Sequence, residues 1–268
     1  MSTVVAIAAV LLVLVVINLW VHVGPTGLHV VTGPLAALLL LVLARAAGLT
    51  WSELGLGSRT FLRGAQVAAA TFVAVAIVYA VAVAIPFTRG AFRDTRYRLG
   101  LWPALYLSLV AIPLGTVLFE EVAFRSVLWG LLARDFGVPV ATAVSATLFG
   151  LWHVLPALAV SRTHTAVRGT TAGVRRVSLT VLATIVFTAI AGVVFAELRR
   201  RSGSLVAPIG LHWATNGLGV LAAARVWALS PGGAASTSGE VAAGDTPVAG
   251  PVSQPVWQRV VRRLSSRS

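Results

Sequence analysis

Long uninterrupted apolar runs dominate the chain, and the charged residues gather in the short stretches between them. A bilayer core is crossed by about 20 apolar residues in helical form. Seven segments meet or approach this length: 4–23, 28–48, 65–87, 101–133, 138–158, 177–198 and 204–228. The first has no positively charged start and no small-residue cleavage site, so we expect a retained helix and not a signal peptide. The pattern predicts an all-α, polytopic integral membrane helix bundle.

The number of transmembrane helices depends on the fourth apolar segment, which is longer than one span requires. It contains Pro103 and Pro113. Proline removes a backbone donor and clashes with the preceding turn, so Pro113 is expected to kink or break this helix. One bent helix gives seven transmembrane helices, and two helices give eight.

Composition shifts divide the chain into three parts. Residues 1–100 hold the first spans and an interfacial segment around Trp51, and residues 101–228 hold the remaining spans, with a basic polar loop expected at 159–176. Residues 229–268 are rich in Pro, Gly and Ser and are expected to form a disordered basic tail. Its last stretch, VWQRVVRRLSSR, has the pattern of an amphipathic helix that lies on anionic lipid.

Composition agrees with a membrane protein. The chain is 57% apolar and 11% charged, against about 25% charged in soluble domains. Cysteine is absent, which excludes disulfides, thiolate metal sites and cysteine nucleophiles. The net charge of +13 comes from arginines that flank apolar runs, so we expect lipid and no nucleic acid as a partner. Arginine without lysine and much Ala and Val suggest a high-GC bacterial gene, and hence the bacterial plasma membrane.

The arginines separate the two faces only partly. Alternating spans put residues 45–63, Arg134 and 199–201 on one face, which we expect to be cytoplasmic, and Arg89 to Arg98 and the 159–176 loop on the other.

Six ionisable or amide side chains interrupt the apolar segments of the second half. Glu120 and Glu121 are adjacent, and Arg125 follows one helical turn later. His153 lies in the next span and His212 in the last, where Asn216 follows it. Each ionisable group inside a bilayer costs roughly 2.5–3.5 kcal/mol on insertion scales, which by default indicates a functional site.

Helical rise brings three of these groups to a similar depth. At 1.5 Å per residue, Glu120, His153 and His212 lie about 21, 22 and 16 Å from the same membrane face. Each residue alone also has a structural explanation: Glu121 and Arg125 as a buried ion pair, a single His or Asn as an interhelical hydrogen-bond partner. The joint pattern favours a site that activates water, with or without a metal.

These residues match a known set. Glu120-Glu121-x-x-x-Arg125, then Phe149-x-x-x-His153, then His212-x-x-x-Asn216 resembles the CPBP family of intramembrane proteases, which comprises the CAAX prenyl endopeptidases and bacteriocin-processing or immunity relatives. The resemblance covers about residues 101–228. Ser126 stands where the family often has Gly.

The resemblance implies a role for each position. Glu120 would be the general base, His153 would hold the attacking water, and His212 with Asn216 would stabilise the oxyanion. Glu121 and Arg125 would orient these groups. In a zinc version, Glu120, His153 and His212 would be the metal ligands. A metal-independent glutamate mechanism is equally compatible with the sequence.

The expected function is therefore an intramembrane endopeptidase that cuts a membrane-associated protein or peptide near the cytoplasmic face. One alternative is a non-catalytic scaffold or immunity protein of the same fold. A second is a proton- or ion-coupled transporter, although the sequence shows no repeat of the kind that transporters carry.

Overall fold

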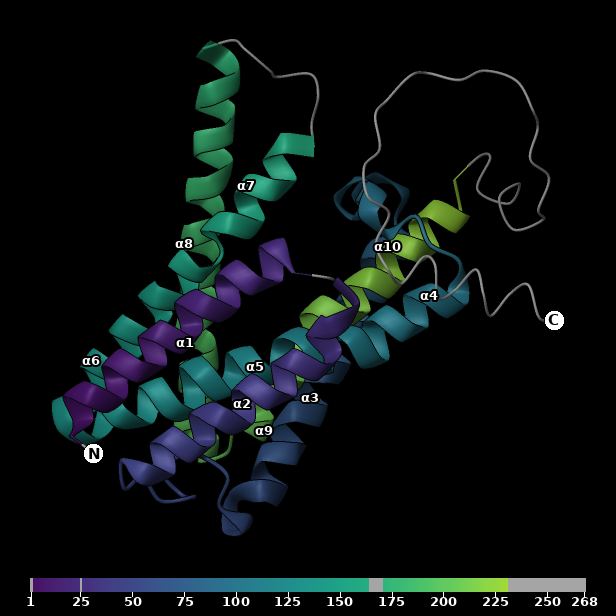
Figure 1. Cartoon of the computed structure of the whole chain (residues 1–268). Coiled ribbons are helices and arrows are strands. Elements are labelled where there is room, and N and C mark those ends of the chain that lie inside the picture. Colours follow the sequence, from purple (N-terminus) through teal and green to yellow (C-terminus); the bar gives the residue numbers. More distant parts are fainter. Residues whose placement is uncertain (1, 25, 164–170, 231–268) are drawn as a thin grey trace, which may run out of the picture.

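The structure is a computed structural model that describes residues 2–24, 26–163 and 171–230. All regular elements in these ranges are helical, which confirms the all-α prediction. The α-helices are α1 (Thr3–Val23), α2 (His29–Ala46), α3 (Ser58–Ala84), α4 (Leu101–Tyr106), α5 (Leu118–Glu121), α6 (Trp129–Trp152), α7 (Val154–Thr163), α8 (Thr171–Ser202), α9 (Val206–Trp213) and α10 (Gly219–Ala228) (Figure 1).

The described ranges contain five helical stretches that are long and apolar enough to cross a membrane. They are Thr3–His22, His29–Ala46, Ser58–Ala84, Leu101–Leu158 and Val177–Ser202. The fourth stretch covers two of the predicted spans, and residues 206–228 are helical as well. Large apolar side chains such as Leu12 and Phe187 point outward, as lipid requires. The protein is an integral membrane protein, and the count of seven or eight spans stays a prediction.

Of the two possibilities predicted at Pro113, a kink or a break, the helix does not show the break. The chain stays helical from Leu101, and Pro113 opens one of the three π-helical segments of the 101–128 stretch: Leu107–Ala111, Pro113–Val117 and Val122–Leu128. The wider π turn lets the N–H of Ile112 reach the carbonyl of Leu107 and adds a residue to the turn, which relieves the clash with the proline ring. The helix changes direction later, at Gly137, whose φ of 81° is left-handed.

The loop predicted at 159–176 is shorter than expected. Helix α7 continues to Thr163 and α8 begins at Thr171, while 164–170 lie outside the described residues. The tail from 231 onward, including the predicted amphipathic helix, also lies outside them. The division of the chain into three parts stays a prediction.

Close contacts between backbones hold the bundle together. Helix α6 packs most extensively against α8, and α3 against α9. A Cβ on Gly150 of α6 would lie 2.8 Å from the carbonyl oxygen of Ile185 on α8, so only glycine allows this approach. Small residues at such crossings are typical of membrane helices, where packing replaces the hydrophobic effect as the force between helices.

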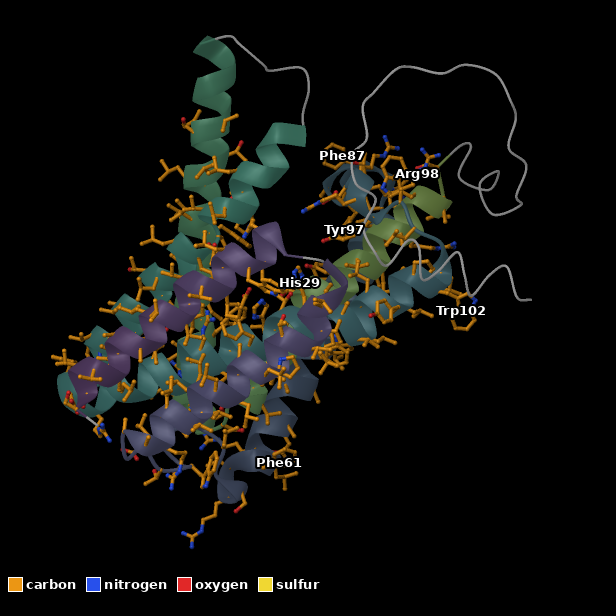
Figure 2. All side chains as sticks on the ribbon, in the orientation of Figure 1. His29, Phe61, Phe87, Tyr97, Arg98 and Trp102 are labelled. Carbon is orange, nitrogen blue, oxygen red and sulfur yellow. The ribbon has the colours of Figure 1, made fainter. Side chains whose placement is uncertain are left out.

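The two ends of the bundle carry different polar groups. At one end, Arg134 donates to the carbonyl of Ala47, and Arg199 donates to the carbonyl of Glu53 at 2.8 Å. At the other end, the indole N–H of Trp227 donates to the carbonyl of Asp94 at 2.9 Å. Figure 2 shows Phe61 at the first end and Phe87, Arg98 and Trp102 at the second. The first end thus joins Arg134 and Arg199 to the 47–57 turn, as the sequence predicted.

Candidate active site

Glu120 lies in the middle of the bundle, on the short α5 turn between two π-helical segments. Its side chain is almost completely buried. Oε1 accepts a hydrogen bond of 2.9 Å from Nε1 of Trp152. Oε2 has no hydrogen-bond partner within the described ranges and lies 3.8 Å from Nε2 of His212. One carboxylate oxygen is therefore fixed, and the other can act on a ligand.

His212 is held by the second glutamate. Its Nδ1 lies 2.8 Å from Oε1 of Glu121, and the same oxygen accepts a hydrogen bond of 3.1 Å from Nη1 of Arg125. A carboxylate that is ion-paired accepts hydrogen bonds, so Nδ1 carries the proton and Nε2 faces Glu120. The two glutamates therefore differ in role: Glu121 orients His212, whereas Oε2 of Glu120 has no hydrogen-bond partner among the described residues.

Arg125 is completely buried and enclosed by aromatic rings. Its guanidinium carbon lies 3.8 Å from the ring centre of Phe149 and 4.8 Å from that of Phe195. The ring of Phe195 also stacks on His212 at 5.0 Å between ring centres. Cation–π contacts of this kind are strongest where water is excluded. They offset part of the cost of burying a guanidinium whose Nε and Nη2 have no hydrogen-bond partner among the described residues.

His153 ends α6, where the backbone leaves the helical conformation. Its Nδ1 lies 2.7 Å from the carbonyl oxygen of Phe149. A carbonyl only accepts hydrogen bonds, so Nδ1 is the donor, and Nε2 of the neutral ring is an acceptor. The Phe149-x-x-x-His153 spacing has a local cause, because Phe149 supplies both the ring under Arg125 and the carbonyl that sets the tautomer of His153.

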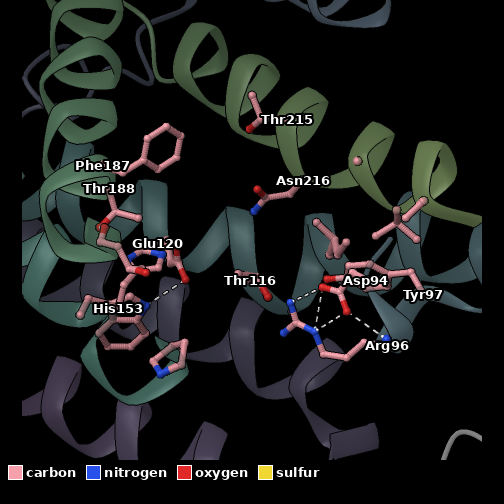
Figure 3. A pocket seen from close by; sticks show the side chains of 18 of the residues that line it. Asp94, Arg96, Tyr97, Thr116, Glu120, His153, Phe187, Thr188, Thr215 and Asn216 are labelled. Carbon is pink, nitrogen blue, oxygen red and sulfur yellow. Dashed lines mark hydrogen bonds and ion pairs between the residues drawn. The ribbon is translucent and has the colours of Figure 1, made fainter. Parts of the chain in front are cut away.

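A cavity of about 750 Å³ connects these groups. Glu120, His153 and Asn216 all line it, from three segments far apart in the sequence. Figure 3 shows Glu120 and His153 at one end, Asp94 and Arg96 at the other, and Asn216 between them. His212 is not part of the lining and reaches the site through Glu120. The structure thus brings the predicted residues together, with His212 behind the cavity wall.

The far end of the cavity lies at the second end of the bundle, beside the 86–97 segment. There Asp94 binds Arg96 through two hydrogen bonds to its Nε, at 3.1 and 3.0 Å, and this pairing raises the pKa of Arg96. Burial raises the pKa of Tyr97, so its phenol is neutral. This end is opposite the arginines of 45–63 and 199–201. The cavity therefore runs from Glu120 toward the end of the bundle opposite those arginines, and the assignment of the cytoplasmic face stays a prediction.

The proposed zinc ligands do not form a metal centre in this arrangement. Both His residues have their Nδ1 atoms fixed and their Nε2 atoms free, as metal-bound His residues do. However, the described parts of the chain contain no group of three or more His, Cys, Asp or Glu side chains placed to hold a metal ion. Of the three candidate ligands, Glu120 and His212 approach to 3.8 Å, and Glu120 and His153 line the same cavity, so the use of a metal stays a prediction.

Two residues of the site were missed in the sequence. Trp152 binds Glu120, and Phe195 stacks on His212 and covers Arg125. Both are aromatic residues in apolar helices, where composition alone does not distinguish them from core residues. In the sequence, the one feature that could have pointed to Trp152 as a site residue was its position next to His153.

Comparison with known families assigns the second half of the chain. Residues 101–218 match the family model described as Type II CAAX prenyl endopeptidase Rce1-like. This part of the chain is similar to the Rce1-like family. The Rce1-like region includes all seven residues of the predicted site, confirms the resemblance to CPBP intramembrane proteases, and identifies the protein as a protease. No curated protein and no solved structure matches the chain.

Proposed function

We propose that the protein is an intramembrane endopeptidase that hydrolyses a peptide bond of a membrane-associated protein or peptide with water activated by Glu120. The observation that supports this most strongly is the state of the Glu120 carboxylate. One of its oxygens is held by Trp152, while the other has no protein partner in the described ranges and lies beside His212. A buried, oriented carboxylate next to a cavity is suited to general-base catalysis.

The proposed reaction is a direct attack by water. Oε2 of Glu120 accepts a proton from the water as its oxygen bonds to the carbonyl carbon of the substrate. The resulting oxyanion accepts hydrogen bonds from the side-chain amide of Asn216, which faces the same cavity. Glu120 then returns the proton to the leaving nitrogen, and the C–N bond breaks to give a carboxylic acid and an amine. Before the attack, Nε2 of His153 accepts a hydrogen bond from the other O–H of the water, which orients the water and keeps that hydrogen on its oxygen.

Glu121, Arg125 and Phe149 support this reaction without touching the substrate. Glu121 fixes the ring of His212, and Arg125 fixes Glu121. The aromatic rings around Arg125 exclude water, which strengthens the ion pair. His212 in turn presents Nε2 to Glu120 and limits the positions that its carboxylate can take.

We propose a mechanism without a metal ion, and the support for it is that the described residues contain no group of three or more candidate ligands placed to hold one. We also propose that cleavage takes place at the cytoplasmic side. The cavity then places the 86–97 segment, with Arg89, Arg93 and Arg96, on that side. Such a cluster between two spans agrees with the tendency of arginine to stay on the cytoplasmic face.

The test is cleavage of a library of quenched membrane peptides by the protein in nanodiscs. Wild type is compared with Glu120→Gln, which keeps the volume of the side chain and removes its basicity. Glu197→Gln is the matched control, because Glu197 is an exposed carboxylate paired with Arg200 and Arg201. We expect loss of cleavage by at least about a hundredfold in Glu120→Gln alone. Equal cleavage by the Glu120 variant would show that another group activates the water.

A further inference from the structure

Trp152 connects the Glu120 carboxylate to the first helix of the protein. Its indole N–H donates to Oε1 of Glu120 at 2.9 Å, and its backbone carbonyl accepts a hydrogen bond of 3.0 Å from Nδ2 of Asn18. Asn18 lies on α1, far outside the Rce1-like region at 101–218. A continuous chain of two hydrogen bonds therefore runs from α1 to the proposed general base.

The carbonyl of Trp152 is available to Asn18 for a reason that the sequence shows. In a continuous helix this carbonyl would accept the N–H of the residue four positions later. That residue is Pro156, which has no N–H. An unsatisfied carbonyl is costly in an apolar environment, and the side chain of Asn18 satisfies it. Asn18 thus completes the backbone hydrogen bonding at the point where α6 ends and α7 begins.

The indole ring forms a wall between two spaces. On one side is the cavity that contains Glu120, and on the other is a groove of about 440 Å³ between α1 and α6. The groove is lined by apolar side chains apart from Asn18 and Trp152. The ring of Trp152 also contacts Phe119 and Phe124, with ring centres 5.8 and 5.9 Å away. These ring contacts hold the indole in an orientation in which its N–H points toward Glu120.

We propose that Trp152 is a positioning residue for Glu120 and that Asn18 of α1 positions Trp152. This inference rests on the proposed function. The hydrogen bond from Trp152 favours the charged form of the carboxylate and fixes its rotation, with Oε2 beside Nε2 of His212 at the edge of the cavity that Glu120 lines. The N-terminal helix is on this account part of the catalytic apparatus, although it carries none of the family motifs.

Three variants of the full-length protein in nanodiscs test this proposal. Trp152→Phe keeps an aromatic ring and removes the donor, and Asn18→Leu keeps the side-chain size and removes the amide. Trp129→Phe is the matched control, because the Nε1 of Trp129 donates to Thr142 at 3.2 Å and Trp129 does not line the cavity. All three variants lose one hydrogen bond, so a purely structural effect would change their melting temperatures and not their pH profiles.

The expected result is a change in kcat and in its pH dependence. For Trp152→Phe we expect kcat to fall ten- to hundredfold, with KM within about twofold, because the carboxylate is misplaced only during the reaction. The acidic limb of the pH profile moves about one pH unit higher, since the charged form has lost a donor. In Asn18→Leu the acidic limb of the pH profile moves in the same direction but by a smaller amount than in Trp152→Phe. In Trp129→Phe the acidic limb stays where it is in wild type. An unchanged profile in Trp152→Phe overturns the proposal.

A second readout does not depend on activity. Infrared difference spectra of wild type against Glu120→Gln isolate the carboxylate band of Glu120, and its loss on acidification is followed in each background. We expect protonation to begin at higher pH in Trp152→Phe than in Trp129→Phe. Identical titration curves of the Glu120 band in Trp152→Phe and Trp129→Phe overturn the positioning role of Trp152, even if cleavage is never detected. Full activity of Glu120→Gln would instead overturn the proposed function, so the two failures are distinguishable.

Discussion

The buried pair of Glu121 and Arg125 offers the sharpest test of how the site is held. Both side chains are inaccessible to solvent, and a single hydrogen bond of 3.1 Å joins them. Glu121→Gln keeps an oxygen for His212 but leaves the guanidinium of Arg125 buried beside a neutral amide. Removing one partner of a buried pair costs about 3–5 kcal/mol. The rings of Phe149 and Phe195 remain in the variant, so their cation–π contacts do not reduce this cost.

The magnitude converts directly into a melting temperature. For a chain of this size, 1 kcal/mol corresponds to about 2–4 °C, so Glu121→Gln should melt about 10 °C below wild type. The double variant Glu121→Gln/Arg125→Met removes the stranded charge and gives the aromatic rings a thioether to pack against. It should recover to within about 2 kcal/mol of wild type. Cleavage should not recover, because the charge that orients His212 is absent in both variants.

The assay is thermal unfolding in nanodiscs at one fixed scan rate, since membrane proteins often unfold irreversibly. Glu197→Gln is the control for loss of a carboxylate, and as a member of an exposed pair it should melt close to wild type. The reasoning is refuted if Glu121→Gln melts with wild type, or if the double variant is no more stable than this single variant.

The other predictions concern metal, helix packing and pH. Cleavage should be unchanged by a zinc chelator, and inhibition that added zinc reverses would contradict the metal-free mechanism. Gly33→Val should lower the melting temperature by about 5 °C through overpacking, because a Cβ there lies 2.5 Å from the carbonyl oxygen of Leu114, whereas Gly90→Val, with no atom nearby, should have little effect. The backbone N–H and the hydroxyl of Thr50 lower the pKa of Glu53. Glu53 therefore stabilises the fold above its unfolded pKa, and the difference in melting temperature between wild type and Glu53→Gln should vanish as the pH falls below about 4.

The sequence was sufficient to predict the membrane bundle and to single out a candidate site, for physical reasons. Apolar runs of span length have few alternatives to transmembrane helices. A glutamate in such a run is so costly that its presence indicates a role, and helical rise was enough to place Glu120, His153 and His212 at one depth. The structure places Glu120 and His212 side by side and puts Glu120 and His153 on one cavity, while their common depth stays a prediction.

Other features depend on interactions that no local pattern contains. The helix continues through Pro113 because π-helical turns absorb the proline, and such turns have no sequence signature. Trp152 and Phe195 resemble ordinary core residues until their partners on other helices are known. The cavity position was also beyond the sequence, because Asp94 and Arg96 reach it from a segment between two spans.

The central claim is that water activated at Glu120 hydrolyses a peptide bond inside the membrane. Cleavage of a substrate peptide in oxygen-18 water, followed by mass spectrometry, tests it most directly. Wild type should place one heavy oxygen in the new carboxyl group of the product, and Glu120→Gln at equal folded concentration should yield no product. Labelled product from the Glu120 variant at the wild-type rate, or wild-type product without the label, would contradict the account.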